Sequence, residues 1–290
     1  MNRFSPSEAA LEGFRLTRER PGTVLTWCGV YFTGILVIAI LMMVSLGPQF
    51  IALAKKGQFT PDDVEAVGGM LAHSGPAFVL VLILAVALMS LLTSGIYRLV
   101  LRPGEPGFAH LRLGRDELRL TAVNLLLFGI GMACLFAGFV AGAAGEQVSP
   151  LVGVIAALVV GLLAIWVGVR LSLATPMTFA THRFSIREAW ALTHGRFWPL
   201  FGMILLAVIF YVMVWLLISI IGLAIVTVAG GEQGGQFTPL AAIAAIATLL
   251  MQLILSVLQL VMIYSPFAVA YQQLHGDAPA RPLQTSDATG

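Results

Sequence analysis

The sequence predicts an all-α integral membrane protein with six transmembrane helices that form three hairpins. Of the 290 residues, 59% are hydrophobic and only 10% are charged, whereas a soluble domain of this size carries about 25% charged residues. The mean hydropathy is +0.94. Apolar stretches longer than the ~20 residues needed to cross a hydrocarbon core lie at about 24–46, 76–101, 121–144, 150–174, 199–228 and 239–264.

The basic residues orient the predicted membrane domain, residues 24–274. All 14 arginines fall before the first stretch, in or next to alternate connections, or in the tail, and the other connections contain only Lys55 and Lys56. Because cytoplasmic loops are enriched in Lys and Arg, both chain ends are predicted to be cytoplasmic. The expected location is the bacterial cytoplasmic (inner) membrane. The expected partners of this face are membrane lipids with anionic headgroups, and not nucleic acid.

Residues 1–23 precede the first stretch and are predicted to form an amphipathic helix at the cytoplasmic surface. The pattern R-F-S-x-x-E-A occurs at 3–9 and again at 183–189. It is typical of a capping box, in which the serine hydroxyl accepts from the amide three residues on and the glutamate reaches back to the serine amide. Residues 108–119 have a similar composition without the box. These segments predict interfacial cytoplasmic helices.

The connections on the opposite side also resemble one another. Q-F-T-P occurs at 58–61 and 236–239, and Q-V-S-P occurs at 147–150. Ser or Thr before Pro predicts a helix N-cap followed by the first helical residue. The first copy is predicted to open a short helix and not a span. The three hairpins are therefore either true repeats or the product of shared helix-start chemistry.

The spans contain no Asp, Glu, Lys or His at mid-depth, which argues against an ion- or proton-coupled pump. Arg98 and Arg170 lie near cytoplasmic ends, where we expect their side chains to snorkel to the interface. The third and fourth stretches carry small residues at four-residue spacing, among them Gly129, Gly153 and Gly161. Such spacing favours close helix packing, either within the chain or at a homodimer seam.

Polar residues on the sixth stretch share one helix face. A hypothesis is that Gln252, Ser256 and Gln259 meet Asn124 of the third stretch in a polar cleft for a lipid headgroup or a small solute. The alternative is ordinary hydrogen bonding between helices, which contributes ~0.6 kcal/mol per bond.

Two cytoplasmic clusters combine arginine with aromatic residues. Arginine binds phosphate through a bidentate fork, and aromatic rings favour the headgroup level of a membrane. The alternative is that these are ordinary positive loops with an aromatic belt. The candidate headgroup-binding residues are Arg112, Arg115, Arg187, Arg196 and Trp198.

No motif of a zinc protease, a serine hydrolase or a nucleotide-binding loop is present. The pairs His110 with Asp116 and His182 with Glu188 are six residues apart, a spacing that points the two side chains away from each other on a helix. Cys28 and Cys134 both fall inside spans, so neither a disulfide nor a thiolate metal site is indicated. No catalytic residue, metal ligand or cofactor is therefore predicted.

The stretch V-R-L-S-L-A-T-P at 169–176, followed by S-I-R-E-A-W-A-L-T-H-G-R-F-W at 185–198, resembles a signature of bacterial polytopic membrane proteins. These are the membrane domain of glycerophosphoryl diester phosphodiesterases and related YciC-like proteins. In fused members of the family, catalysis belongs to a separate soluble barrel. The resemblance therefore implies a non-catalytic membrane module here, because the tail at 275–290 is short and is expected to be disordered.

These observations favour a non-enzymatic, lipid-interacting or scaffolding module of the cell envelope. The first alternative is a carrier or permease for a lipid or an amphipathic small molecule. The second is an integral-membrane lipid enzyme, which requires the histidine and carboxylate side chains to converge in space. Homo-oligomerisation, or a soluble partner at the cytoplasmic face, also fits the sequence.

Overall fold

The computed structural model describes residues 5–55, 61–104, 109–228 and 239–276, and within these ranges the chain forms α-helices and no β-strand. Three helices are short and six are long. The short ones are α1 (Pro6–Glu19), α6 (Ala174–Thr181) and α7 (Ile186–Leu192). The long ones are α2 (Pro21–Lys55), α3 (Pro61–Leu101), α4 (Arg115–Glu146), α5 (Pro150–Leu171), α8 (Phe197–Val228) and α9 (Pro239–Gly276).

Six helical segments are long and apolar enough to span a membrane, which confirms the predicted all-α fold class. Two helices are longer than the apolar stretches predicted. α3 runs without a break from Pro61 through Pro76, where the sequence predicted a separate short helix before the span. α9 continues through Pro266 to Gly276, beyond the predicted end near residue 264. A proline removes one helical hydrogen bond but does not by itself end a helix that neighbouring elements support.

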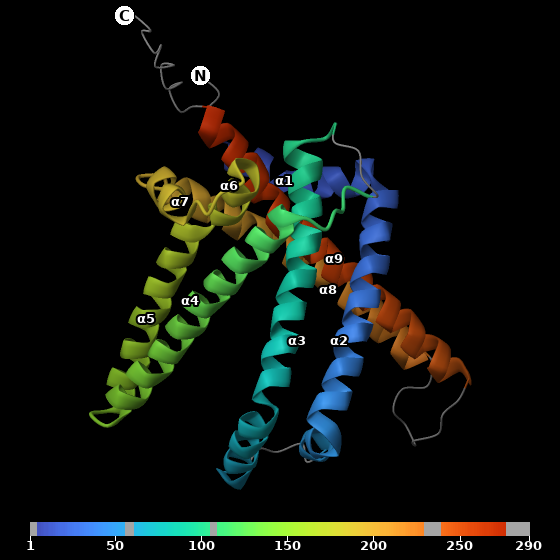
Figure 1. Ribbon diagram of the computed structural model, residues 1–290, viewed down its shortest axis with the longest axis vertical. Coiled ribbons are helices and arrows are strands. Elements are labelled where there is room, and N and C mark those ends of the chain that lie inside the picture. Colours follow the sequence, from blue (N-terminus) through green and yellow to red (C-terminus); the bar gives the residue numbers. More distant parts are fainter. Residues whose placement is uncertain (1–4, 56–60, 105–108, 229–238, 277–290) are drawn as a thin grey trace, which may run out of the picture.

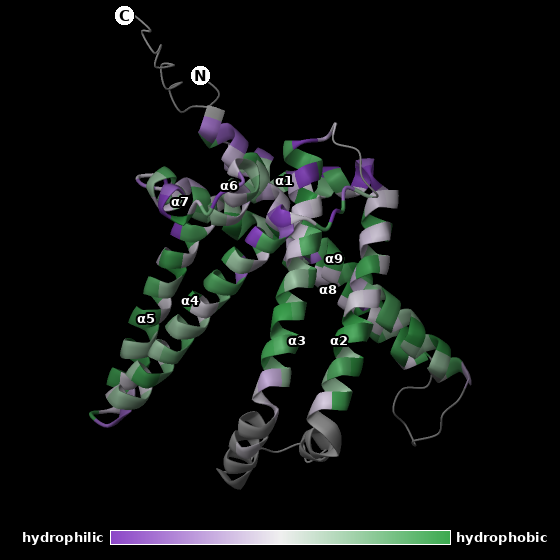
Figure 2. Cartoon of the chain, in the orientation of Figure 1, coloured by the Kyte–Doolittle hydropathy of each residue, from purple (hydrophilic) through white to green (hydrophobic). Residues whose placement is uncertain are grey.

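The long helices pair into the hairpins α2–α3, α4–α5 and α8–α9 (Figure 1). The hairpins meet at one end of the molecule, beside α1, α6 and α7, and diverge away from it. Hydrophilic residues gather at the shared end, whereas the stems of the hairpins are apolar (Figure 2). We call the shared end the arginine-rich end; it comprises α1, α6, α7, the described connections 102–104, 109–114, 182–185 and 193–196, and the ends of the long helices that adjoin them.

Helix starts follow the predicted caps only in part. Ser149 caps α5 as expected, since its hydroxyl accepts from the Val152 amide. Ser5 and Ser185 occupy the N-cap positions of α1 and α7, but neither makes the side-chain bond of a capping box. The Ser5 amide instead donates to Oε1 of Gln273 on α9. The capping-box prediction is therefore wrong, because a tertiary partner replaces the local glutamate.

The predicted third interfacial segment, 108–119, is also not a helix of its own. Residues 109–114 are irregular, and α4 begins at Arg115. Ala109 and His110 have positive φ angles of 49° and 59°, a conformation that does not continue a right-handed helix. This segment connects α3 to α4 and does not repeat α1 or α7.

Small residues bring α4 and α5 close together. A Cβ atom at Gly145 would lie 2.7 Å from the Cα atom of Gly153, and one at Gly142 would lie 3.5 Å from the Cβ atom of Ala157. This is packing within the chain. Gly129 and Gly161, which belong to the same sequence patterns, have no such neighbour within 4 Å among the described residues.

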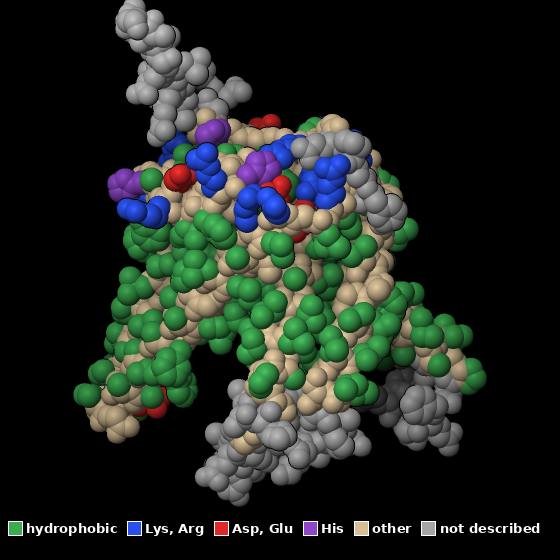
Figure 3. Space-filling model, viewed as in Figure 1, with side chains coloured by type: hydrophobic (Ala, Val, Ile, Leu, Met, Phe, Trp, Pro, Cys, Tyr) green, Lys and Arg blue, Asp and Glu red, His purple; other side chains and the backbone are tan. Residues whose placement is uncertain are grey.

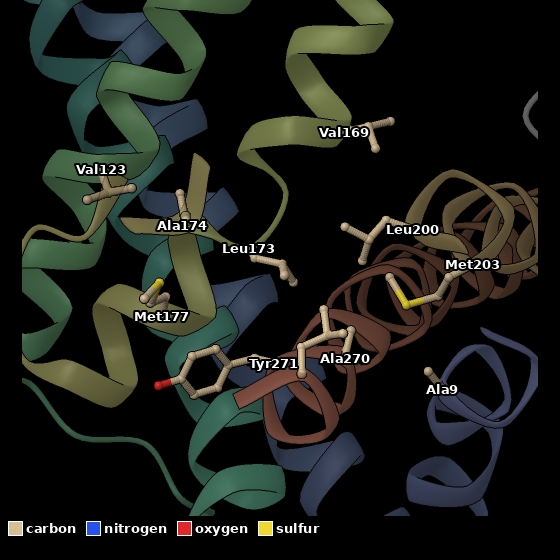
Figure 4. Close-up of a cluster of buried hydrophobic side chains, with 12 residues drawn as sticks. Ala9, Val123, Val169, Leu173, Ala174, Met177, Leu200, Met203, Ala270 and Tyr271 are labelled. Atoms are coloured by element: carbon tan, nitrogen blue, oxygen red, sulfur yellow. The ribbon is translucent and has the colours of Figure 1, made fainter. Parts of the chain in front are cut away.

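Most buried side chains lie at or near the arginine-rich end. One cluster joins Leu173 and Met177 to Leu200 of α8 and Ala270 of α9 (Figure 4). A second cluster surrounds Trp27, which packs against α3 and α9. Side chains therefore hold the hairpins together near one end, while much of the stem surface remains exposed.

Candidate functional site

Basic side chains gather over one end of the apolar stems (Figure 3). The predicted headgroup residues Arg112, Arg115 and Arg187 are exposed there, and Arg196 is partly buried. Trp198 at the start of α8 is 76% exposed. None of these arginines forms an ion pair with a residue that the structure describes. They lie in two groups, one before and at the start of α4 and one on α7 and the turn after it.

Arg98 and Glu117 form a buried ion pair between α3 and α4. Their exposed fractions are 3% and 6%, and Nη2 of Arg98 lies 2.6 Å from Oε1 of Glu117. The same guanidinium donates from Nη1 to the carbonyl of His110 and lies 5.5 Å from the Phe179 ring centroid. Arg98 therefore does not snorkel as expected. It links two hairpins to the connection between them and to α6.

A second polar cluster brings together residues that the sequence placed in separate groups. Nδ1 of His182 lies 2.7 Å from Oδ1 of Asp116, and Arg119 donates to the same oxygen at 3.0 Å. Nε2 of His182 lies 2.9 Å from Nη2 of Arg102, so this nitrogen accepts from the guanidinium. Both ring nitrogens of His182 therefore have partners, whereas a general base needs a free nitrogen that faces its substrate. The cluster instead joins α4 to α6 and to the residue that follows α3.

Arg170 at the end of α5 is 7% exposed and packs against two indole rings that also contact each other. Its guanidinium carbon is 5.6 Å from the Trp166 ring centroid and 4.7 Å from that of Trp190. Nη2 contacts Nδ1 of His194 at 3.4 Å, and Nε has no hydrogen-bond partner. The sequence predicted a snorkelling side chain here as well, because it could not show that α7 folds back over α5.

The predicted polar residues of the spans are divided between two interfaces. Asn124 donates to the hydroxyl of Ser90, between α4 and α3. Gln259 accepts from the hydroxyl of Tyr211, between α9 and α8, and Ser256 donates to the Gln252 carbonyl of its own helix. No hydrogen bond among the described residues joins Asn124 to the α9 group. Gln252 and Gln259 are exposed.

The described residues contain no group of three His, Cys, Asp or Glu that could hold a metal ion. The exposed side chains at the arginine-rich end include guanidinium groups and the indole ring of Trp198. These groups bind oxyanions such as phosphate through charge-assisted hydrogen bonds and shield them from water.

His110 gives the arginine-rich end a predicted pH dependence. Burial, reinforced by the charges of Arg20 and Arg98, holds the pKa of His110 below its usual value. As the pH falls, the unfolded chain therefore takes up this proton before the folded chain does. The contribution of His110 to stability is complete above pH ~6.5 and decreases as the pH falls through that value towards the folded-state pKa.

We therefore expect the stability of a His110→Asn variant to change less between pH 7 and pH 5 than that of the wild type. Asparagine tolerates the positive φ angle of this position. Denaturation by dodecyl sulfate at a series of pH values measures the slope, and His275→Asn is the control for removing an exposed histidine. Equal slopes in wild type and His110→Asn would contradict the prediction.

Comparison of the chain with protein-family models, with curated proteins and with solved structures found no match in any of the three. The resemblance carried by residues 169–198 therefore remains an expectation. The function has to be inferred from the contacts and charges of the chain itself.

Proposed function

We propose that this polytopic membrane protein is a non-enzymatic module of the bacterial cytoplasmic membrane that binds anionic phospholipids at its arginine-rich end. In this proposal the arginine-rich end faces the cytoplasm. The asymmetry of the basic residues supports the orientation, because loops rich in Lys and Arg are retained on that side.

The observation that carries the proposal is the combination of exposed arginines with apolar stems directly beneath them. Arg112, Arg115 and Arg187 have no carboxylate partner among the described residues, so their charges are available to headgroups. The stems expose large side chains such as Leu162 and Phe139, which suit acyl chains. Each basic residue near an anionic leaflet contributes about 1 kcal/mol of attraction.

A carrier for an amphipathic molecule is the second candidate, and one observation favours it. Gln252 and Gln259 are exposed near the middle of the segment Ala242–His275. A polar side chain at this depth needs a hydrogen-bond partner, and Gln259 obtains one from Tyr211 of the neighbouring helix. Gln252 could meet a polar solute moving along α9.

We expect the double substitution Arg187→Gln/Arg196→Gln to weaken the binding of anionic lipid about 30-fold, because each lost charge removes ~1 kcal/mol of attraction. Native mass spectrometry of the detergent-purified protein measures retained phosphatidylglycerol. The matched control is Arg15→Gln/Arg18→Gln, which removes the same charge from α1.

Equal losses in both double variants would indicate unspecific attraction. Unchanged retention, or no retained lipid in any form of the protein, would contradict headgroup binding at α7. Transport along the polar face of α9 would then be the next hypothesis to test.

A further inference from the structure

Arg170 is a buried cation without a counter-ion in the part of the chain that the structure describes. No ion pair joins it to a carboxylate of a described residue, and its Nε atom lacks a hydrogen-bond partner. Burying a charge costs several kcal/mol unless an opposite charge and hydrogen bonds compensate. Arg98, which also lies at the end of a spanning segment, forms an ion pair with Glu117, whereas Arg170 has no carboxylate partner among the described residues.

The surroundings of Arg170 are formed to hold the guanidinium in place. Trp166 of α5 and Trp190 of α7 meet edge to face, with ring centroids 5.3 Å apart and an interplanar angle of 86°. Thr193 donates to the Arg170 carbonyl at 3.0 Å and so fixes the end of α7 to α5. Cation–π contacts orient a guanidinium but leave its charge unneutralised. His194 covers one edge of the guanidinium and is itself exposed.

A shallow, open apolar groove of about 410 Å³ lies on the face of α5 next to this cage. It is lined by Val159, Leu162, Leu163 and Trp166, and Trp166 also packs against Arg170. These residues form one stripe along α5. From Val159 to Arg170 a helix rises ~16 Å, close to the ~15 Å depth of one leaflet of a hydrocarbon core.

We infer that Arg170, Trp166, Trp190 and His194 bind the phosphate group of one anionic phospholipid, one of whose acyl chains lies in the groove along α5. The inference rests on the proposed function and assigns it a specific site. The buried guanidinium supplies the charge, His194 supplies an accessible hydrogen-bonding nitrogen, and the groove supplies an apolar surface of the length of one acyl chain. A phospholipid combines these features in a single molecule.

The test compares the binding of the first phosphatidylglycerol molecule by native mass spectrometry in detergent, with phosphatidylcholine as the reference lipid. We expect Arg170→Gln to weaken phosphatidylglycerol binding at least tenfold, as for the loss of a charge-assisted hydrogen bond. Arg170→Lys keeps the charge without the planar fork, so we expect an intermediate loss. Arg15→Gln on α1 is the control for removing one arginine from the same end.

Val159→Trp tests the groove without touching Arg170. We expect it to weaken the binding of long-chain phosphatidylglycerol several-fold and to leave dihexanoyl phosphatidylglycerol unaffected. If Arg170→Gln does not fold, as judged by its circular dichroism, Arg170→Lys and Val159→Trp carry the test. Unchanged binding of long-chain phosphatidylglycerol in both of these variants would overturn the inference.

Other outcomes separate the site from the proposed function. Tighter binding of phosphatidylglycerol than of phosphatidylcholine, equal in wild type and Arg170→Gln, would overturn the site and leave the proposed function standing. No preference for phosphatidylglycerol in the wild type would overturn both. Displacement of the lipid by millimolar inorganic phosphate, with Val159→Trp unchanged, would identify a site for free phosphate and overturn the assignment to a lipid.

Discussion

Glu117→Gln is expected to lower the free energy of unfolding by about 3–5 kcal/mol, the effect of removing one partner from a buried ion pair. Glu117 is 6% exposed and lies 2.6 Å from Nη2 of Arg98. The amide keeps the shape of the carboxylate and removes its charge, so the guanidinium of Arg98 loses its ion pair with Glu117. Unfolding of the detergent-solubilised protein by dodecyl sulfate, followed by circular dichroism, measures the loss.

Glu19→Gln is the matched control, because it makes the same chemical change at an exposed pair with Arg15. It should change stability far less. The double substitution Arg98→Met/Glu117→Leu provides a second check, since removing both charges costs less than removing one. If Glu117→Gln were as stable as Glu19→Gln, the buried pair would not hold α3 and α4 together.

Trp27→Ala is expected to lower the free energy of unfolding by about 3–5 kcal/mol, the range for removing a buried tryptophan side chain. The side chain has no exposed surface, and it packs in the cluster that joins α2 to α3 and α9. Its indole nitrogen donates to the Ala109 carbonyl at 2.9 Å. A Cβ atom at Gly95 would lie 2.8 Å from Cδ2 of Leu111 and 3.4 Å from that nitrogen, so the absence of a side chain at Gly95 makes room chiefly for Leu111, which packs against the same cluster.

Trp27→Phe separates packing from hydrogen bonding. It keeps an aromatic ring but leaves the Ala109 carbonyl without its donor, so we expect a smaller loss of about 1–3 kcal/mol. The exposed Trp198 supplies the control substitution Trp198→Ala, measured by the same denaturation. A loss for Trp27→Ala no larger than that for Trp198→Ala would show that the α2–α3 hairpin does not depend on this residue.

The spans were predictable because length and hydropathy alone define them. A stretch such as 199–228 crosses a bilayer whatever its neighbours are, and α8 covers Phe197–Val228 accordingly. Their pairing into hairpins also followed from the order of the stretches and the short connections between some of them. The ends of α3 and α9 were less predictable, because Pro76 and Pro266 lie inside helices that continue past them.

The polar contacts were not predictable, because they join segments distant in the chain. His182 meets Asp116 across 66 residues, whereas local spacing indicated only that His182 and Glu188, like His110 and Asp116, point away from each other. Burial of Arg98 and Arg170 likewise depends on how α6 and α7 fold back over the stems. An arginine at the end of an apolar stretch gives no sign of whether water, a carboxylate or an indole ring will surround it.

The divergence of the hairpins has a consequence for the bilayer that surrounds them. A protein whose stems meet near one surface and separate towards the other is a tapered inclusion, with a smaller cross-section in one leaflet than in the other. Lipid tails have to fill the spaces between the stems in the wider leaflet, because hydrocarbon leaves no void beside an apolar helix. The number of lipids in contact with the protein therefore differs between the two leaflets, and local bilayer curvature becomes a variable that acts on the spacing of the hairpins.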